Sequence, residues 1–301
     1  MELHHLRSFV RAVDLGSFNA AAASLNYTGP AISQHVGALE LELGVTVLMR
    51  QARGVSPTAA GTVLYERAVT LLDLADGVVQ EVREVALAPT VVRVGAFSTA
   101  AQFLLPSVLS TLLTTHPGLE VVLIDREPPE GFADVRAGRL DVTITHCYSG
   151  IAPTDPQGLG VETLVRDPLV LLVPTGHPAV DGVALDALAH ERWVSGPPDA
   201  QNHIALEWAA AHAGFVPEVA FETTDYAVTM TLVANGLGPA FVPRLILDRV
   251  PDGVRTVELA DDHGLERVIS LVYREPVRSD TLGLVLDELR AVGRAAAMMS
   301  P

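Results

Sequence analysis

Apolar residues in the first 45 positions recur with the spacing of short amphipathic helices. A stripe at i, i+3, i+4 and i+7 predicts a first helix over residues 3–14 that ends at Gly16. The members of this stripe are Leu6, Phe9, Val10 and Val13. Ser17 is placed to cap an alanine-rich second helix, and Thr28 is placed to cap a third helix whose first turn holds Pro30.

The third helix is expected to end at Gly44, after which the pattern changes to two short extended runs. Residues 45–50 and 55–58 favour strands, and residues 51–54 between them favour a hairpin turn. This order of elements is typical of a winged helix-turn-helix, which places its recognition helix in the major groove of DNA. A helical packing module without a ligand is the alternative interpretation of residues 3–58.

A further apolar stripe, with alternating steps of four and three, runs along residues 64–85. It has the a/d spacing of a coiled coil over about three heptads, in a helix of about 28 residues and about 42 Å. The stripe comprises Leu64, Ala68, Leu71, Ala75, Val78, Val82 and Val85. Because so small a domain cannot cover so long a helix, we expect it to pair with its copy in a homodimer; burial against its own chain is the alternative. A two-fold dimer suits the reading of two DNA half-sites.

Strands alternate with helices beyond Pro89, where the long helix is expected to break and a hinge to follow. Expected strands cover residues 91–97, 119–124, 141–145, 169–173, 193–195, 219–221, 239–242 and 267–273. Expected helices cover residues 101–115, 129–137, 201–213, 226–234 and 281–298. This alternation predicts an α/β domain with a sheet that is parallel at least in part.

Ligands of open α/β sheets bind beyond the carboxyl ends of strands, where helix N-termini offer N–H groups. This rule selects candidate effector-binding residues, which are Ser98, Thr99, Thr145, His146, Ser195, Gly196, Thr224 and Asp225. Ser98, Thr99, Thr224 and Asp225 are equally interpreted as helix caps. Asp225 in such a pocket disfavours a simple anionic effector and leaves cationic and neutral ones open.

Charge and composition narrow the picture. The chain has 301 residues and a formal net charge of -16, yet residues 1–66 hold four arginines against five carboxylates, so nearly all of the excess acid lies beyond them. This distribution tolerates DNA binding. A single cysteine, no secretory signal and no apolar run of about 18 residues predict a cytoplasmic protein that does not span a membrane.

Sequence motifs of catalysis and metal binding are absent. The chain lacks the glycine-rich nucleotide loops, the His-Glu-x-x-His motif and the Gly-x-Ser-x-Gly motif, so we expect no catalytic residues, no cofactor and no metal site. His146 beside Cys147 does not supply the spaced ligands of a metal site, and a lone cysteine is most often a small buried hydrophobe. The competing hypothesis is an enzyme or solute-binding protein of periplasmic-binding-protein fold that carries a helical leader.

The chain resembles the LysR-type transcriptional regulators over nearly its whole length. The matching N-terminal segments are Leu6-Arg7-Ser8-Phe9-Val10, Gly16-Ser17-Phe18, Ala21-Ala22-Ala23-Ser24-Leu25, Pro30-Ala31-Ile32-Ser33, Leu39-Glu40, Leu43-Gly44 and Thr58-Ala59-Ala60-Gly61. Later matches are Pro106, His116-Pro117, Gly138-Arg139-Leu140-Asp141, His177-Pro178 and Val233-Ala234-Asn235-Gly236-Leu237-Gly238. Two positions depart from the family: Gly29 replaces a glutamine that often reads a base, and Gln34 replaces an arginine. Candidate DNA contacts are therefore Thr28, Pro30, Ser33, Gln34 and His35 in the reader, with Arg50 and Arg53 on the wing.

The resemblance implies a sequence-specific regulator, a homodimer or a homotetramer, whose two α/β subdomains share crossover strands and close on a small effector. The implied fold is an N-terminal winged helix-turn-helix over residues 1–58, a linker and dimerisation helix over residues 59–88 and a periplasmic-binding-protein-like domain over residues 89–301. Subdomain I covers about residues 91–165 and 266–301, and subdomain II covers about residues 166–265. The operator, the effector and the sign of regulation stay open.

Overall fold

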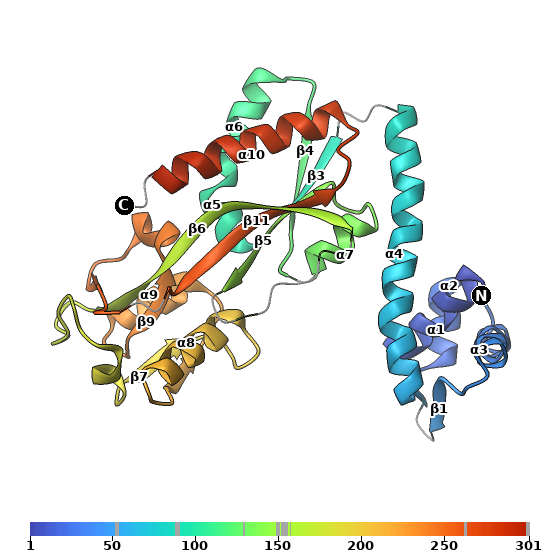
Figure 1. Ribbon diagram of the computed structural model, residues 1–301, viewed down its shortest axis with the longest axis horizontal. Helices are drawn as coiled ribbons and strands as arrows, with labels where there is room; N and C mark the ends of the chain where they lie inside the picture. Colours follow the sequence, from blue (N-terminus) through green and yellow to red (C-terminus); the bar gives the residue numbers. More distant parts are fainter. Residues whose placement is uncertain are drawn as a thin grey trace. The chain divides into compact units, whose positions relative to one another are not determined.

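The computed structural model describes residues 1–51, 54–87, 91–128, 130–148, 151, 156, 158–261 and 264–298. The chain divides into two compact units, Met1–Leu87 with the short segment Ala133–Arg139, and the remainder of the chain. Each unit is described by itself below (Figure 1).

Three helices form the head of the first unit: α1 (Leu3–Leu15), α2 (Phe18–Leu25) and α3 (Gly29–Leu43). The expected boundary residues are confirmed. Gly16 ends α1 in the left-handed conformation, Ser17 caps α2 by accepting from the Ala20 amide, and Thr28 caps α3 by accepting from the Ala31 amide. The three helices enclose one core with buried residues from each of them, among which are Phe9, Ala21, Ile32 and Leu39.

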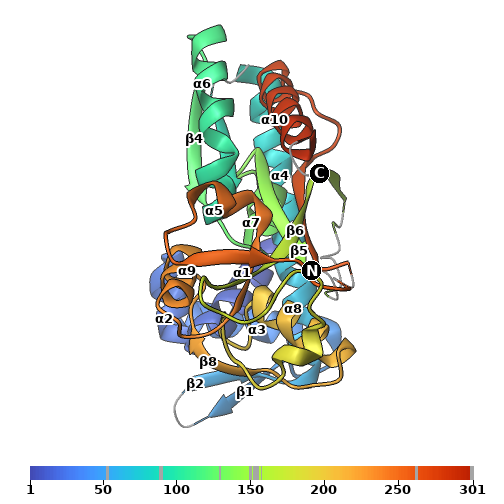
Figure 2. The same cartoon turned by 90° about the vertical axis from the view of Figure 1, so that its left-hand side faces the viewer.

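The predicted wing is an antiparallel hairpin of β1 (Leu48–Gln51) and β2 (Gly54–Pro57), and Figure 2 shows its strands side by side. Helix α4 (Ala59–Leu87) follows directly. Thr58 starts this helix by accepting a 3.0 Å hydrogen bond from the Gly61 amide, while its own amide donates to Val47. Glycine is required at position 61, because a Cβ there would lie 2.0 Å from the Val47 carbonyl oxygen.

Only the first part of the apolar stripe on helix α4 is buried by other residues of the same chain. Leu64 and Ala68 pack into the core of the first unit, and Tyr65 hydrogen-bonds Asp14 of α1 at 2.6 Å. The predicted seam is therefore wrong at its start, because the head of the unit already occupies that face. The exposed apolar residues of the stripe and its flank begin one turn later and are Leu71, Leu74, Val78, Val79 and Val82.

The second unit is built on a mixed sheet in the order β10-β6-β11-β5-β3-β4, with β9 also paired to β6. Its strands are β3 (Val91–Ala96), β4 (Glu120–Asp125), β5 (Val142–Tyr148), β6 (Leu159–Pro174), β9 (Ala240–Pro243), β10 (Val254–Val257) and β11 (Glu266–Arg274). Strands β3, β4 and β5 run parallel, whereas β11 pairs antiparallel with both β5 and β6. The predicted partly parallel α/β sheet is thus confirmed.

Strand β6 joins the two halves of the sheet. Residues Leu159 to Pro168 pair with β11 except Leu164, where the register shifts, and Leu169 to Pro174 pair with β9 and β10. The sequence predicted only residues 169–173 of this strand, because its first half shows neither an unbroken apolar run nor strict alternation: the polar pairs Glu162-Thr163 and Arg166-Asp167 interrupt it. Strand β10 was not predicted at all.

The helices of this unit that flank the sheet are α5 (Ser98–Phe103), α6 (Leu105–Thr115) and α10 (Asp280–Met298), while α7 (Glu130–Arg136) begins in this unit and continues into the segment assigned to the first unit. The single helix expected over residues 101–115 is wrong. The structure has two helices that meet at Leu104, since Pro106 lacks the amide hydrogen that would continue the first of them. Helices α6 and α10 pack with β3, β5 and β11 around the largest apolar core of this unit.

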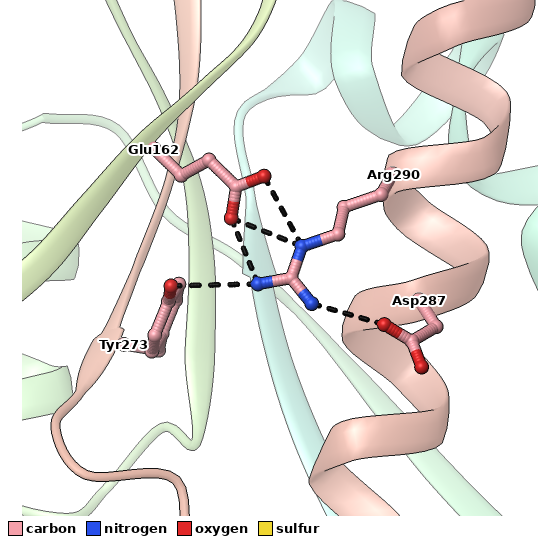
Figure 3. A network of polar contacts seen from close by, with 4 residues as sticks. All are labelled: Glu162, Tyr273, Asp287 and Arg290. Carbon is pink, nitrogen blue, oxygen red and sulfur yellow. Dashed lines mark hydrogen bonds and ion pairs between the residues drawn. The ribbon is translucent and has the colours of Figure 1, made fainter.

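A polar network holds α10 on the sheet (Figure 3). Arg290 donates to both carboxylate oxygens of Glu162 on β6 and to Asp287 one turn earlier on its own helix. Its guanidinium also reaches the hydroxyl of Tyr273 on β11 at 3.5 Å. The hydrogen bond to Glu162, more than any other contact, raises the pKa of Arg290 further above its ordinary value.

The second half of this unit, formed by residues between the end of β6 and the start of β11, carries a separate two-stranded parallel sheet of β7 (Arg192–Ser195) and β8 (Glu218–Glu222). Helices α8 (Gln201–His212) and α9 (Tyr226–Ala234) and two 3-10 turns, η1 (Leu185–Leu188) and η2 (Arg244–Arg249), complete it. Trp193, fully buried, stacks on Phe241 in its core. The expected helix over residues 226–234 is confirmed at both ends.

Candidate DNA-reading helix and effector cavity

The outward face of α3 carries three of the predicted DNA-contacting residues. Thr28, Pro30 and Gln34 are exposed, and Gly37 lies one turn beyond Gln34 on the same side. Because Ile32, Val36 and Leu39 fill the core, the side chain of Gln34 points away from it. Gln34 carries an amide that is able to pair with two polar atoms of an adenine base.

The other predicted DNA contacts differ in their surroundings. Ser33 and His35 are half-buried, and Nδ1 of His35 lies 2.8 Å from the hydroxyl of Ser8 on α1. Arg50 belongs to β1, and Arg53 lies outside the described residues. The hairpin that forms the wing is therefore present, and a DNA contact by Arg53 at its tip stays a prediction.

The second unit contains a cavity of about 640 Å³, a volume usual for small-molecule sites. Residues from both halves of the unit line it, and they come from β3–α5, β5, the segments before α7 and α8, α9, η2 and β11. The lining includes the polar and aromatic side chains of Phe97, Ser98, Thr99, Glu127, His146, Tyr148, Asp199, Gln201, Thr224, Asp225, Tyr226 and Arg267.

Five of the eight residues selected by the strand-end rule line this cavity: Ser98, Thr99, His146, Thr224 and Asp225. Asp225 also caps α9 by accepting a 2.8 Å bond from the Ala227 amide, so the capping interpretation holds beside the lining one. Ser98 is the first residue of α5, which leaves Phe97 at the cap position without a side-chain hydrogen bond.

Thr145 does not line the cavity. Strand β5 runs on to Tyr148, three residues past the expected end, so Thr145 lies inside a strand and not beyond it. Side chains alternate between the faces of a strand, and His146 and Tyr148 occupy the cavity face while Thr145 is buried on the other. Tyr148 is therefore the second residue of β5 that lines the cavity, and the sequence rule did not select it.

Ser195 and Gly196 do not line the cavity either. Ser195 is buried and its carbonyl accepts a hydrogen bond from the Thr223 amide, which continues the pairing of β7 with β8. The carbonyl of Gly196 lies 2.8 Å from Nδ1 of the buried His203. The segment that follows β7 reaches the cavity instead, with residues from Pro197 to Asn202.

The polar centre of the cavity is Arg267, which the sequence interpretation did not select. In the strand register Arg267 of β11 stands opposite Asp167 of β6 on one side and Tyr148 of β5 on the other. Its guanidinium donates to Asp167 at 2.7 Å and to the Thr99 hydroxyl at 2.9 Å. Both members of the ion pair are almost fully buried, with side chains 1% and 3% exposed. No local sequence signal marks this pair, because Asp167 and Arg267 meet only through the register of β6 and β11.

Aromatic side chains surround this ion pair. The Arg267 guanidinium lies 5.1 Å from the centre of the Phe97 ring, a cation–π contact. Tyr148 and Tyr226 share a 2.7 Å hydrogen bond between their hydroxyl groups. Burial raises the pKa of Tyr226 well above its ordinary value, so this hydroxyl stays protonated.

His146 and Glu127 form the second polar pair of the cavity. Nε2 of His146 lies 3.3 Å from a carboxylate oxygen of Glu127. Burial, which outweighs this contact, lowers the pKa of His146, whereas the hydrogen bond from His146 lowers the pKa of Glu127. The pair is thus a neutral imidazole beside an ionised carboxylate at neutral pH.

One buried donor at the centre of the cavity, Nε of Arg267, has no hydrogen-bond partner within the described part of the chain. The side chain of Gln201 acts on His146 as a hydrogen-bond partner and so raises its pKa, although less than burial lowers it. An unused buried donor costs about 1–3 kcal/mol, so native proteins seldom keep one without a use. The cavity therefore holds donor capacity that the protein itself does not consume.

Cys147, the only cysteine, points away from the cavity on β5. Its thiol donates to the carbonyl of Ile151 at 3.4 Å, and burial raises its pKa. A raised pKa keeps the sulfur as a thiol, which is the less reactive form.

Comparison with known proteins assigns the chain to a family. Residues 3–62 match the family model "Bacterial regulatory helix-turn-helix protein, lysR family", and residues 87–294 match "LysR substrate binding domain". The chain belongs to the LysR family of transcriptional regulators. As a LysR-type regulator it combines a DNA-binding winged helix-turn-helix with an effector-binding domain of two α/β subdomains.

Curated relatives and solved structures agree with this assignment. The probable HTH-type transcriptional regulator LrrA of Synechococcus elongatus is 30% identical over 96% of this chain and 97% of its own. Full-length BenM, a regulator from Acinetobacter baylyi, is 26% identical with a TM-score of 0.59, and the match covers 98% of both chains. CbnR solved with its target DNA is 26% identical with a TM-score of 0.53, over 97% of this chain and all of that one.

These comparisons decide between the functional alternatives. The families and relatives are transcriptional regulators, so the prediction that this LysR-type protein is not an enzyme is confirmed, and the solute-binding alternative is set aside. No helix in the described part of the chain is long and apolar enough to cross a bilayer.

Proposed function

We propose that this LysR-type regulator is controlled by a small polar effector that binds in the 640 Å³ cavity and draws the two halves of the effector domain together. The observation that carries the proposal is the composition of the cavity wall, to which α5 and β5 contribute from one half and α9 and the segment before α8 from the other. A ligand that contacts both halves favours their closed arrangement, because it shifts a conformational equilibrium through its differential affinity.

The charges of the cavity favour a neutral or cationic effector over an anion. Three exposed or half-exposed carboxylates line it, those of Glu127, Asp199 and Asp225. The single arginine in the wall, Arg267, already donates to Asp167 and to Thr99. An entering anion would therefore meet uncompensated negative charge, whereas an ammonium or a hydroxyl would meet acceptors. Phe97, Tyr148 and Tyr226 provide aromatic faces for a ring or a cation.

A thermal-shift screen of amines, neutral polar metabolites and carboxylates tests the effector class, since a ligand that binds the folded state raises its apparent stability. Asp225→Asn is the matched variant, because asparagine keeps the cap of α9 and removes only the charge. A cationic ligand that contacts Asp225 is expected to lose about tenfold in affinity, as for one charge-assisted hydrogen bond. Hits that are all carboxylates, and that bind more tightly to the variant, would overturn the proposed class.

For the DNA half, we propose that α3 reads bases with Gln34 and that Thr28, Pro30, Ser33 and His35 lie at the same interface. Arg50 and Arg53 of the wing are proposed to contact the DNA backbone. The exposed position of Gln34 on a helix whose opposite side fills the core supports this assignment. Because Gly29 and Gly37 offer no side chain, Gln34 carries much of the sequence discrimination.

Gel shifts with DNA from upstream of the protein's own gene test the reader. Gln34→Ala is expected to relax preference at one base pair by about 1–3 kcal/mol, whereas Arg53→Ala should weaken all sites and reduce the salt dependence. A uniform loss of affinity in Gln34→Ala would show that Gln34 does not read a base.

We further propose that α4 pairs with its copy in a homodimer, and that dimers associate into a tetramer in the cytoplasm. The apolar stripe from Leu71 to Val82 supports the first step, because its valines at positions 78 and 82 are 60% and 65% exposed. The corresponding domain limits are residues 1–58 for the reader, 59–88 for the linker helix and 89–301 for the effector domain, with subdomains at about 91–165 with 266–301 and at about 166–265. Light scattering of Val78→Glu and Val82→Glu tests the seam; a dimer unchanged by both substitutions would contradict it.

A further inference from the structure

Three histidines that are far apart in the sequence meet at the edge of the DNA-reading unit. His4 and His5 lie in the first turn of α1, and His35 lies in the middle of α3. One ring nitrogen from each of the three lies within 4.8 Å of the others. The ring centres are 4.2 Å apart for His4 and His5, 5.0 Å for His4 and His35, and 5.1 Å for His5 and His35.

We infer that His4, His5 and His35 form a binding site for a transition metal ion of the zinc class, which links α1 to the reader helix. The spacing of the rings fits one ion. With Zn–N distances of about 2.0–2.1 Å and tetrahedral angles, imidazole centres around one zinc lie about 5 Å apart. Two of the three observed separations have this value, and the third, 4.2 Å between His4 and His5, must widen by rotation of these two side chains in the first turn of α1.

A buried serine orients His35 as a ligand. Ser8 is fully buried, and its hydroxyl donates a 2.9 Å hydrogen bond to the His4 carbonyl one turn earlier in α1. That bond uses the single proton of the hydroxyl, so the 2.8 Å contact with His35 has Nδ1–H as donor and the Ser8 oxygen as acceptor. Nε2 of His35 is then the unprotonated nitrogen. Metal-bound histidines regularly donate their other ring N–H to such a partner, which fixes the tautomer.

The electrostatics of the cluster favour a metal over protons. Three imidazoles at these distances repel one another when protonated, whereas their neutral forms offer three lone pairs to a single cation. One doubly charged ion therefore satisfies all three lone pairs at once.

The chemistry of the donors selects the class of ion. Three imidazole nitrogens suit Zn²⁺, Ni²⁺, Co²⁺ or Cu²⁺, whereas Ca²⁺ and Mg²⁺ require oxygen ligands. Three protein ligands leave a further coordination position for water or for a group of another molecule. The sequence alone predicted no metal site, because thirty residues separate His5 from His35 and only the packing of α1 against α3 brings them together.

A bound ion has a direct consequence for the reader. Tyr27, in the turn before α3, packs edge-on against His35 at 5.1 Å. An ion held by all three histidines would connect the start of α1, this turn and α3, and so reduce the freedom of α3 to adjust to DNA. Metal occupancy is thereby expected to change DNA affinity independently of the effector cavity.

The test uses the untagged full-length chain after treatment with a chelator, titrated with Zn²⁺ by calorimetry and with Co²⁺ by visible absorption. We expect one tight equivalent per chain that His4→Gln, His5→Gln and His35→Gln each weaken at least tenfold. His190→Gln, at an exposed histidine of the other unit, is the matched control and should bind as the unchanged chain does. Circular dichroism of each metal-free variant verifies that the reader is folded.

Ser8→Ala distinguishes a metal site with an oriented ligand from nonspecific metal binding by surface histidines. It keeps all three imidazoles and removes only the partner of His35, so Zn²⁺ affinity is expected to fall by about 10–100-fold. The inference is overturned if the tight equivalent persists in the triple His4, His5 and His35 variant, or if His190→Gln removes it. An affinity equal in Ser8→Ala and the unchanged chain would show adventitious binding only.

Discussion

The reader helix and the effector cavity obtain their functional residues in different ways. The reader takes almost all of its exposed candidates from one helix and its cap, so that Thr28, Pro30 and Gln34 are neighbours in sequence and in space. The cavity collects side chains from seven separate elements, and its central ion pair joins residues 100 positions apart. The first arrangement depends on local periodicity, and the second depends on the register of a sheet.

The two regions also treat charge differently. Gln34 and Pro30, the candidates on the outer face of the reader helix α3, are exposed, and within the described residues their side chains make none of the hydrogen bonds that hold the first unit together. The cavity buries Arg267 with Asp167, and Asp167 additionally accepts from the Leu245 amide, so this pair connects β6, β11 and η2. Substitutions in the cavity are therefore expected to cost stability, whereas those on the outer face of α3 should change recognition alone.

The largest expected effect is that of Arg267→Ala. It leaves Asp167 buried without its partner, and the free energy of unfolding of the effector domain should fall by about 3–5 kcal/mol. Urea unfolding followed by tryptophan fluorescence measures this domain selectively, because both tryptophans, Trp193 and Trp208, lie in it.

The control for Arg267→Ala is Arg166→Ala, which removes an exposed arginine that pairs with Glu266 on the same two strands. Exposed pairs contribute at most about 1 kcal/mol, so this variant should unfold nearly as the unchanged protein does. Equal losses in the two variants would contradict the special role of the buried pair.

Gly61→Ala is expected to act in the other unit. The added Cβ would meet the Val47 carbonyl, and overpacking against backbone typically costs about 1–3 kcal/mol. The helical signal in circular dichroism should show the loss while tryptophan fluorescence unfolds as before.

Gly37→Ala is the matched control for Gly61→Ala, since a Cβ at position 37 meets nothing within 4 Å. Alanine is favoured over glycine in a helix by about 1 kcal/mol, so this substitution should stabilise the reader slightly. If Gly37→Ala destabilised it as much as Gly61→Ala, the contact with Val47 would not be the cause.

Tyr226→Phe removes one hydroxyl from the tyrosine pair of the cavity. The loss of the hydrogen bond to Tyr148 should cost about 0.5–1.5 kcal/mol in urea unfolding. A double-mutant cycle with Tyr148→Phe isolates the pair, and additive effects of the two substitutions would rule out their coupling.

The smallest expected effect is a pH dependence from His146. Its pKa in the folded protein is below the ordinary value of 6.5, so the unfolded chain binds more protons as the pH falls through 6.5. The stability of the effector domain should then decrease on acidification, by at most about 1.4 kcal/mol per pH unit. His146→Gln should flatten this slope between pH 7 and 5, which urea unfolding followed by tryptophan fluorescence at each pH measures; an equal slope in the variant would contradict the assignment to His146.

Particular residues show how far the sequence alone reaches. Ser17, Thr28 and Gly16 mark helix ends through local hydrogen bonds and backbone conformation, and all three were predicted correctly. Thr145 was misplaced because the end of β5 depends on its pairing with β11, which a local pattern does not contain. Arg267 was missed for the same reason, since only the register sets it beside Asp167 and Tyr148.

The central claim, that occupancy of the cavity controls the reader, is tested most directly by fluorescence anisotropy of labelled upstream DNA. The titration is made with and without each compound that raises the melting temperature. The account predicts that such a compound changes the DNA affinity of the full-length chain, and that Asp225→Asn weakens this response while leaving the affinity without the compound unchanged. A compound that is shown to bind in the cavity at saturation and yet leaves DNA binding unaltered would contradict it.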